Sequence, residues 1–173
     1  MTFDPVIVLV VRLGLALLLL GAAFQKLRDI GDFRVVLATY RVLPDRFVGV
    51  AAWIVVAFEV VVGIGALLQI RPAYVGAIVL LLGYAGAMAL NLWRGRRLID
   101  CGCGGGVQPL TIGLVVRNVV LAVGASVALS PAFVRPLGWL DFVSVTGGTA
   151  MLVLLYAATN QLLAARARLE EWV

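Results

Sequence analysis

Long apolar runs separated by short polar stretches dominate the sequence. A helix needs about 20 predominantly apolar residues to cross the hydrocarbon core of a bilayer. Because the connections are short and contain no low-complexity linker, we expect one membrane domain over residues 1–173. The pattern predicts membrane-spanning helices over residues 6–24, 47–69, 72–93, 112–129 and 140–163.

The stretch that follows the first run has a different pattern. Between residues 25 and 46, apolar side chains recur at steps of three or four, and charged side chains fill other positions. This pattern predicts a short amphipathic helix lying in the membrane interface. Asp32 is its expected N-cap and Pro44 its expected end. An ordinary structured loop is the alternative.

Composition leads to the same fold class. Hydrophobic residues make up 63% of the chain, charged residues only 13%, and the mean hydropathy is +1.09. A soluble domain is closer to half apolar and a quarter charged. We therefore expect an all-α integral membrane bundle of about five transmembrane helices. The chain contains no histidine, which excludes imidazole metal sites and histidine acid–base catalysis.

The net charge of +5 comes from arginines and lysines concentrated in the loops. No separate basic domain exists, so we expect no nucleic-acid binding. The positive-inside rule instead favours an outside N-terminus and a cytoplasmic C-terminus. That orientation places ten basic residues inside and two, Arg71 and Arg135, outside. The ten are Lys26, Arg28, Arg34, Arg41, Arg46, Arg94, Arg96, Arg97, Arg166 and Arg168.

The loop over residues 94–111 contains the only two cysteines, Cys101 and Cys103, in a glycine-rich setting. A disulfide between cysteines one residue apart closes a tight ring, and strained disulfides suit exchange better than structure. Gly102 supplies the backbone freedom that such a ring needs. Nearby arginines, among them Arg97, favour the reactive thiolate, whereas Asp100 opposes it.

Two other interpretations of the cysteines remain open. They are small apolar residues of the kind usually buried without a role, although this loop is the most polar in the chain. In the second interpretation, the two cysteines form half of a zinc site, and a second chain supplies the other ligands. We predict no metal site within one chain.

Polar residues inside the predicted spans are the next candidates. An ionised carboxylate such as that of Glu59 is costly in a membrane unless it pairs, takes up a proton or faces water. Arg12 and Arg117 are its candidate partners, and a structural ion pair competes with a proton-relay role. Arg117 is also placed to support the cysteine loop, and Asn118 to hydrogen-bond between helices.

The stretch from Leu90 to Arg97, the D-C-G-C-G-G sequence beginning at Asp100, and the pair Arg117-Asn118 together resemble the MauE family of methylamine utilisation proteins, related to DoxX-like membrane proteins. The match runs from the first span to the fourth. It aligns Cys101 and Cys103 with the cysteine pair of that family.

The resemblance implies a multi-pass protein of the bacterial cytoplasmic membrane. It also implies help in maturing methylamine dehydrogenase, whose small subunit is rich in disulfides, together with a thioredoxin-like partner similar to MauD. That client is periplasmic, whereas the charge pattern puts the cysteine loop on the cytoplasmic side. A loop folded back into the inner half of the bundle would reconcile the two.

The leading hypothesis is thus a membrane thiol–disulfide redox component, with thiol–disulfide oxidoreductase as the corresponding enzyme activity. One alternative is a non-catalytic assembly factor whose loop only docks a partner. Another is a protein that binds a quinone or other small molecule near Glu59, the arginines and several aromatic side chains. Interface anchoring or packing also explains those aromatic residues, which are Trp53, Tyr74, Tyr84 and Trp93. No cofactor follows from the residues themselves.

The ten-to-two split of basic residues predicts the orientation directly. Reporter domains fused at Val173 and within the 94–111 loop should both report a cytoplasmic location. Strong activity of a periplasm-dependent reporter at both positions would contradict this orientation.

Overall fold

The computed structural model is all-α and describes residues 3–96, 110–131 and 135–170. The predicted helical fold class is confirmed. A short helix follows the first long one, as the sequence indicates. The helices in the described ranges are α1 (Pro5–Arg28), α2 (Ile30–Thr39), α3 (Asp45–Leu67), α4 (Arg71–Trp93), α5 (Ile112–Ala128) and α6 (Trp139–Glu170).

Four of these helices are long and apolar enough to cross a membrane: α1, α3, α4 and the Trp139–Ala165 part of α6. Helix α5 is also apolar but has only 17 residues. At 1.5 Å per residue it extends about 25 Å, somewhat less than the usual hydrocarbon thickness of about 30 Å. The chain is a multi-pass membrane protein.

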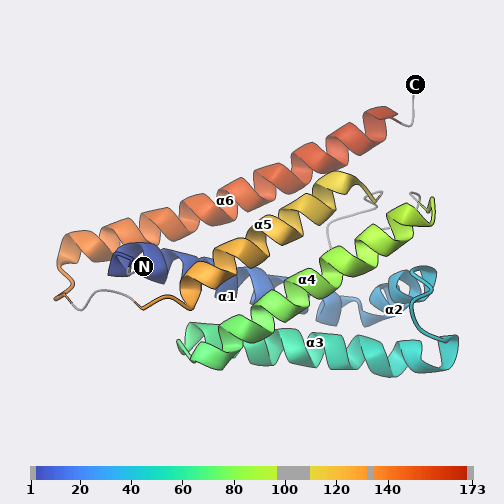
Figure 1. Ribbon diagram of the computed structural model, residues 1–173, viewed down its shortest axis with the longest axis horizontal. Coiled ribbons are helices and arrows are strands. Elements are labelled where there is room, and N and C mark those ends of the chain that lie inside the picture. Colours follow the sequence, from blue (N-terminus) through green and yellow to red (C-terminus); the bar gives the residue numbers. More distant parts are fainter. Residues whose placement is uncertain (1–2, 97–109, 132–134, 171–173) are drawn as a thin grey trace.

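Helices α1, α3, α4 and α5 form the centre of the bundle, and α6 lies along its outside. The main contacts join α4 to α5, α1 to α3, α3 to α4 and α1 to α5, while α6 packs chiefly on α1. Figure 1 shows α6 and α3 at opposite edges of the bundle. The central cluster includes the buried side chains Leu15, Leu19, Val62, Tyr74, Leu81 and Ala122.

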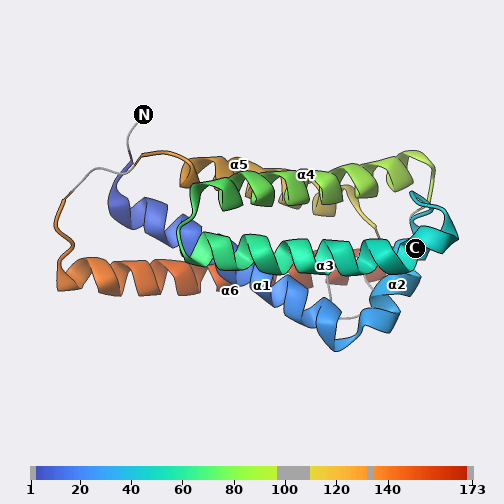
Figure 2. The ribbon, with the colours of Figure 1, turned by 90° about the horizontal axis from the view of Figure 1, so that it is seen from below.

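The short helix α2 differs in its boundaries from the prediction. Asp29, not Asp32, is its N-cap: the Asp29 carboxylate accepts a hydrogen bond from the Asp32 backbone N–H at 3.0 Å. The helix ends at Thr39, and Arg41 follows with a φ of 45° in the left-handed region. Pro44 is instead the N-cap of α3. Figure 2 shows α2 at the end of the bundle where α3 begins.

The basic residues collect at one end of the molecule. The C-terminal ends of α1 and α4, the N-terminal end of α3 and all of α2 meet there (Figure 1). The charge asymmetry in the sequence is therefore an asymmetry between the two ends of the bundle. Its orientation in a membrane stays a prediction. The arginines at this end are Arg28, Arg34, Arg41, Arg46, Arg94 and Arg96.

The opposite end is held by an exposed cluster of charges. Arg135 donates to Asp141 at 2.8 Å and to Asp4, the N-cap of α1, at 3.3 Å. The Val6 backbone N–H and the Arg135 guanidinium both hold the pKa of Asp4 below its ordinary value. This cluster joins the start of α1 to the start of α6.

Helices α3 and α4 approach closely near their connecting turn. A Cβ atom added at Gly65 would lie 2.8 Å from the Cβ of Ala73, which cannot rotate away because it is fixed to the backbone. Gly49 lies on the same helix as Gly65, but a Cβ atom added there would meet no atom within 4 Å.

We therefore expect Gly65→Ala to lower the free energy of unfolding by about 1–3 kcal/mol, the usual cost of overpacking. Gly49→Ala should leave stability unchanged or raise it by about 0.5–1 kcal/mol, because Ala is the better helix former. Denaturation of the purified protein in detergent measures both. Equal stabilities of the two variants would show that the close approach is not a constraint.

Candidate functional site

A buried ion pair joins the first and second long helices. On α1, the buried positions Leu19, Ala23 and Lys26 follow one another at helical steps. On α3, Val56, Glu59 and Val62 do the same. The helical period therefore places one charged side chain of each helix on its packing face.

The two charges meet in close geometry. The ammonium group of Lys26 donates to both carboxylate oxygens of Glu59, at 2.7 and 3.0 Å. The hydroxyl of Tyr84, on α4, donates to Glu59 Oε1 at 2.5 Å. Lys26 is 6% exposed and Glu59 is fully buried. The predicted candidates Arg12 and Arg117 are thus not the partners of Glu59; that partner is Lys26.

Aromatic rings surround the ammonium group of Lys26. It lies 5.4 Å from the ring centroid of Phe33, on α2, and 5.3 Å from that of Tyr84. Cation–π contacts of this kind are strongest where water is excluded. The cluster therefore links four helices around one compensated charge pair. Its geometry fits a structural role, and it also gives Glu59 a hydroxyl with which a proton could be shared.

Arg12 has a different task at the other end of the bundle. Its guanidinium donates to the carbonyl of Ala128, the last residue of α5, at 3.1 and 3.0 Å. Arg71 donates to the adjacent carbonyl of Leu129 at 3.1 Å. The last carbonyls of a helix lack intrahelical partners and carry partial negative charge. The two arginines therefore cap the C-terminus of α5.

Arg117 and Asn118 lie inside the first turns of α5 and are both buried. Arg117 hydrogen-bonds to the side-chain oxygen of Asn160 and lies 5.3 Å from the ring centroid of Tyr156, both on α6. Asn118 donates to the carbonyl of Leu114 at 2.8 Å, and its amide lies 3.9 Å from the sulfur of Met88. Arg117 thus connects α5 to the outer helix, and Asn118 faces α4.

The cysteine segment leaves and rejoins the bundle close to these residues. Cys101, Cys103 and Arg97 lie outside the described residues. On one side, Gly95 ends α4 with a φ of 73°, and the Arg96 N–H donates to the carbonyl of the buried Asn91 at 3.0 Å. On the other side, Leu110 is 1% exposed. It packs in one cluster with Tyr40, Met88 and Leu114.

Leu110 therefore anchors one end of the segment in the core where α5 begins, and the backbone hydrogen bond from Arg96 to Asn91 fixes the other end to the last turn of α4. Met88 and Leu114 contact both the Leu110 anchor and the side chain of Asn118. Arg117 is the next residue along α5. The structure thus brings the attachment points of the cysteine loop together with the Arg117-Asn118 pair, and it places Glu59 in a separate cluster.

Sequence reasoning missed Lys26, Tyr156 and Asn160 as parts of these clusters, whereas Tyr84 was already a candidate neighbour of Glu59. Lys26 was detectable, because it continues the buried stripe of the first helix beyond the predicted end at residue 24. The pairing of Arg117 with Asn160 was not, since it depends on how the last helix packs. Of the four aromatic residues considered as the lining of a cavity near Glu59, Tyr84 contacts Glu59. Tyr74 is buried and donates to the Ala66 carbonyl, whereas Trp53 and Trp93 are exposed.

Comparisons with known proteins agree with the motifs. The family model described as "Methylamine utilisation protein MauE" matches residues 4–131. The MauE of Paracoccus denitrificans is 38% identical over 162 residues, covering 90% of this chain and 87% of that protein. For Paracoccus versutus the identity is 36% over 166 residues, covering 92% and 88%. The MauE of Methylophilus methylotrophus is 32% identical over 167 residues, covering 92% and 87%. No solved structure matches the chain.

The buried pair predicts a characteristic pattern of stabilities. Glu59→Gln or Lys26→Met alone should lower the free energy of unfolding by about 3–5 kcal/mol, because each leaves one buried charge uncompensated. The double variant Lys26→Met/Glu59→Gln should recover part of that loss. Glu59→Lys should be worse than Glu59→Gln, since it places two ammonium groups together. Additive effects of the two single substitutions in a denaturation series would contradict the pairing.

Proposed function

The chain belongs to the MauE family of methylamine utilisation proteins, and on that basis we propose that it serves methylamine utilisation as a membrane thiol–disulfide redox component. The reactive groups are Cys101 and Cys103, whose motif lies in a segment anchored at both ends in the bundle. The observation that supports the proposal is the burial of Leu110, which follows the motif: it packs with Met88 and Leu114, and both of these also contact the side chain of Asn118.

A buried arginine next to the attachment points supports thiolate chemistry. Positive charge favours the thiolate over the thiol, and only the thiolate attacks a disulfide. The Asn160 and Tyr156 side chains hold the guanidinium of Arg117 in place. Arg117 is therefore proposed as a positioning residue that raises the local positive potential. Asn118 is proposed to keep the start of α5 packed on α4.

In the proposed exchange, the disulfide of the partner protein is the oxidant, so no other oxidant is needed. The thiolate of one cysteine attacks a disulfide of the partner protein, forms a mixed disulfide and releases the second partner sulfur as a thiolate. The other cysteine of the pair, as its thiolate, then attacks the mixed disulfide. This second attack closes the Cys101–Cys103 disulfide and leaves the partner as a dithiol. Two electrons move to the partner, and the reverse sequence of steps oxidises it.

The proposed partner is a thioredoxin-like protein similar to MauD, and the proposed client is the small subunit of methylamine dehydrogenase. These assignments come from the family resemblance. Leu110, at the end of the segment, is buried in the bundle, and on that basis we propose a loop that folds toward the bundle. Such a loop would be presented to a partner by the rigid helix ends rather than by a mobile domain.

Trapping experiments test the cysteine pair. Replacing the resolving cysteine by Ser should trap a covalent complex with the thioredoxin-like partner, visible on a non-reducing gel and lost on reduction. Replacing the attacking cysteine should not. The double variant Cys101→Ser/Cys103→Ser should abolish client maturation. Normal maturation with the double variant would overturn the redox role and leave a non-catalytic assembly factor.

A substitution of Arg117 tests whether its positive charge favours the reactive thiolate. Arg117→Gln removes the charge and keeps a side chain able to hydrogen-bond, so the protein should still accumulate in membranes. If the guanidinium lowers the thiol pKa by about one unit, trapping should slow by about threefold, because the tenfold loss of thiolate is partly offset by the greater nucleophilicity of a less acidic thiol. That rate difference should shrink as pH rises and both proteins become fully thiolate. An unchanged trapping rate at neutral pH would exclude this role of Arg117.

A further inference from the structure

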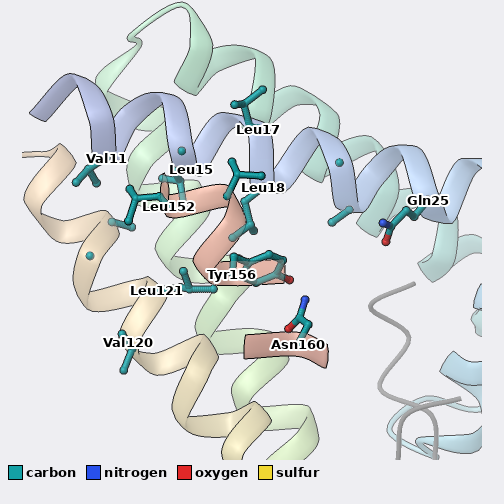
Figure 3. A pocket seen from close by; sticks show the side chains of 16 residues that line it. Val11, Leu15, Leu17, Leu18, Gln25, Val120, Leu121, Leu152, Tyr156 and Asn160 are labelled. Atoms are coloured by element: carbon teal, nitrogen blue, oxygen red, sulfur yellow. The ribbon is translucent and has the colours of Figure 1, made fainter. Parts of the chain in front are cut away.

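An elongated cavity of about 600 Å³ lies between α1, α5 and α6 (Figure 3). It follows α1 from Val11 to Gln25, a distance of about 21 Å at 1.5 Å per residue. Ligand cavities in proteins usually have volumes of about 300–1,000 Å³. Helix α1 contacts both α5 and α6, and the strongest helix contacts do not include α5 with α6. The space between α5 and α6 is therefore open to an occupant.

The polar side chains of the cavity are gathered at one end. Figure 3 shows Val11 toward one end of the lining and Gln25 and Asn160 toward the other. Tyr156 is one helical turn before Asn160 on α6, and Leu152 continues this face one turn further into the apolar part. Among the described residues that line the cavity, none is charged. The cavity thus has an apolar length and an uncharged polar end.

Arg117 does not line the cavity, but it contacts two residues of its polar end, Tyr156 and Asn160. Its hydrogen bond to Asn160 and its contact with the Tyr156 ring orient both groups. The amide groups of Gln25 and Asn160 and the hydroxyl of Tyr156 can hydrogen-bond to oxygens that carry partial negative charge. The Tyr156 ring offers a flat surface, which suits a flat ring in the ligand.

From this geometry we infer that the cavity binds an isoprenoid quinone, with its ring between Gln25, Tyr156 and Asn160 and its tail along α1 toward Val11. A long apolar tail matches the length of the cavity, and two carbonyl oxygens match an uncharged end that has hydrogen-bond donors. An anionic phospholipid would place a full charge against a lining that has none. The site does not depend on disulfide exchange, so either proposal stands if the other fails.

Two glycines in the lining allow the cavity to be filled. Gly124 on α5 and Gly21 on α1 both line it, and a Cβ atom added at either meets no atom within 4 Å. Gly83 on α4 has equally open space but does not line the cavity. Gly124→Phe and Gly21→Phe therefore fill the cavity without a backbone clash, and Gly83→Phe is the matched control.

The experiment is photolabelling of the purified full-length protein in detergent with an azido-substituted ubiquinone analogue. Labelled peptides should come from α1, α5 and α6, and ubiquinone-2 should compete for the label. Gly124→Phe and Gly21→Phe should each lower the apparent affinity at least about tenfold, whereas Gly83→Phe should not. Gln25→Leu should lower it about fivefold through one lost hydrogen bond, and the exposed Gln161→Leu should not.

Labelling should be the same in the double Cys→Ser variant, which separates this site from the proposed redox role. Equal competition by diacylglycerol or phosphatidylglycerol would show a generic lipid slot and overturn the inference. Unchanged labelling in both Phe variants of the cavity would overturn it too. If either Gly124→Phe or Gly21→Phe fails to fold, as judged by its thermal denaturation, the labelling of the other variant tests the inference.

Discussion

The pairing of Lys26 with Glu59 is the constraint on which the arrangement of the bundle depends. An unpaired charge inside a membrane protein is expensive, so these two side chains must meet wherever their helices pack. Their contact fixes the rotation of α1 against α3. The hydroxyl of Tyr84 and the ring of Phe33 then bring α4 and α2 to the same point. Apolar packing alone, which lipid can replace, would specify these relations less strictly.

Much of the fold follows from the sequence because the bilayer sets the length of each apolar run. The helical bundle and the short helix after the first span were predictable on that basis. The end of α1 was not found, since charged residues after Phe24 resemble an interfacial segment. The helix continues to Arg28, because Lys26 has a buried partner and its charge therefore does not end the span. Pairing across helices decided a boundary that hydropathy could not.

The candidate site was predictable only in part. The cysteine motif and the Arg117-Asn118 pair are visible in the sequence, and the segment that contains the motif leads directly into the helix that carries the pair. Which helix would supply the partner of Arg117 could not be inferred, because Asn160 lies 43 positions away on a helix that packs chiefly on α1. The cavity between α1, α5 and α6 depends in the same way on how helices distant in sequence cross.

The short helix α5 has a consequence for the surrounding lipid. It has 17 residues, whereas α1 has 24, and Arg12 and Arg71 close its C-terminal end with charged groups. The hydrophobic thickness of the protein therefore differs around its circumference, and lipid beside α5 meets a shorter apolar surface. Adjusting a bilayer to such a mismatch costs fractions of a kcal/mol per Å. Acyl-chain length is thus a variable that changes how much the bilayer must adjust beside α5.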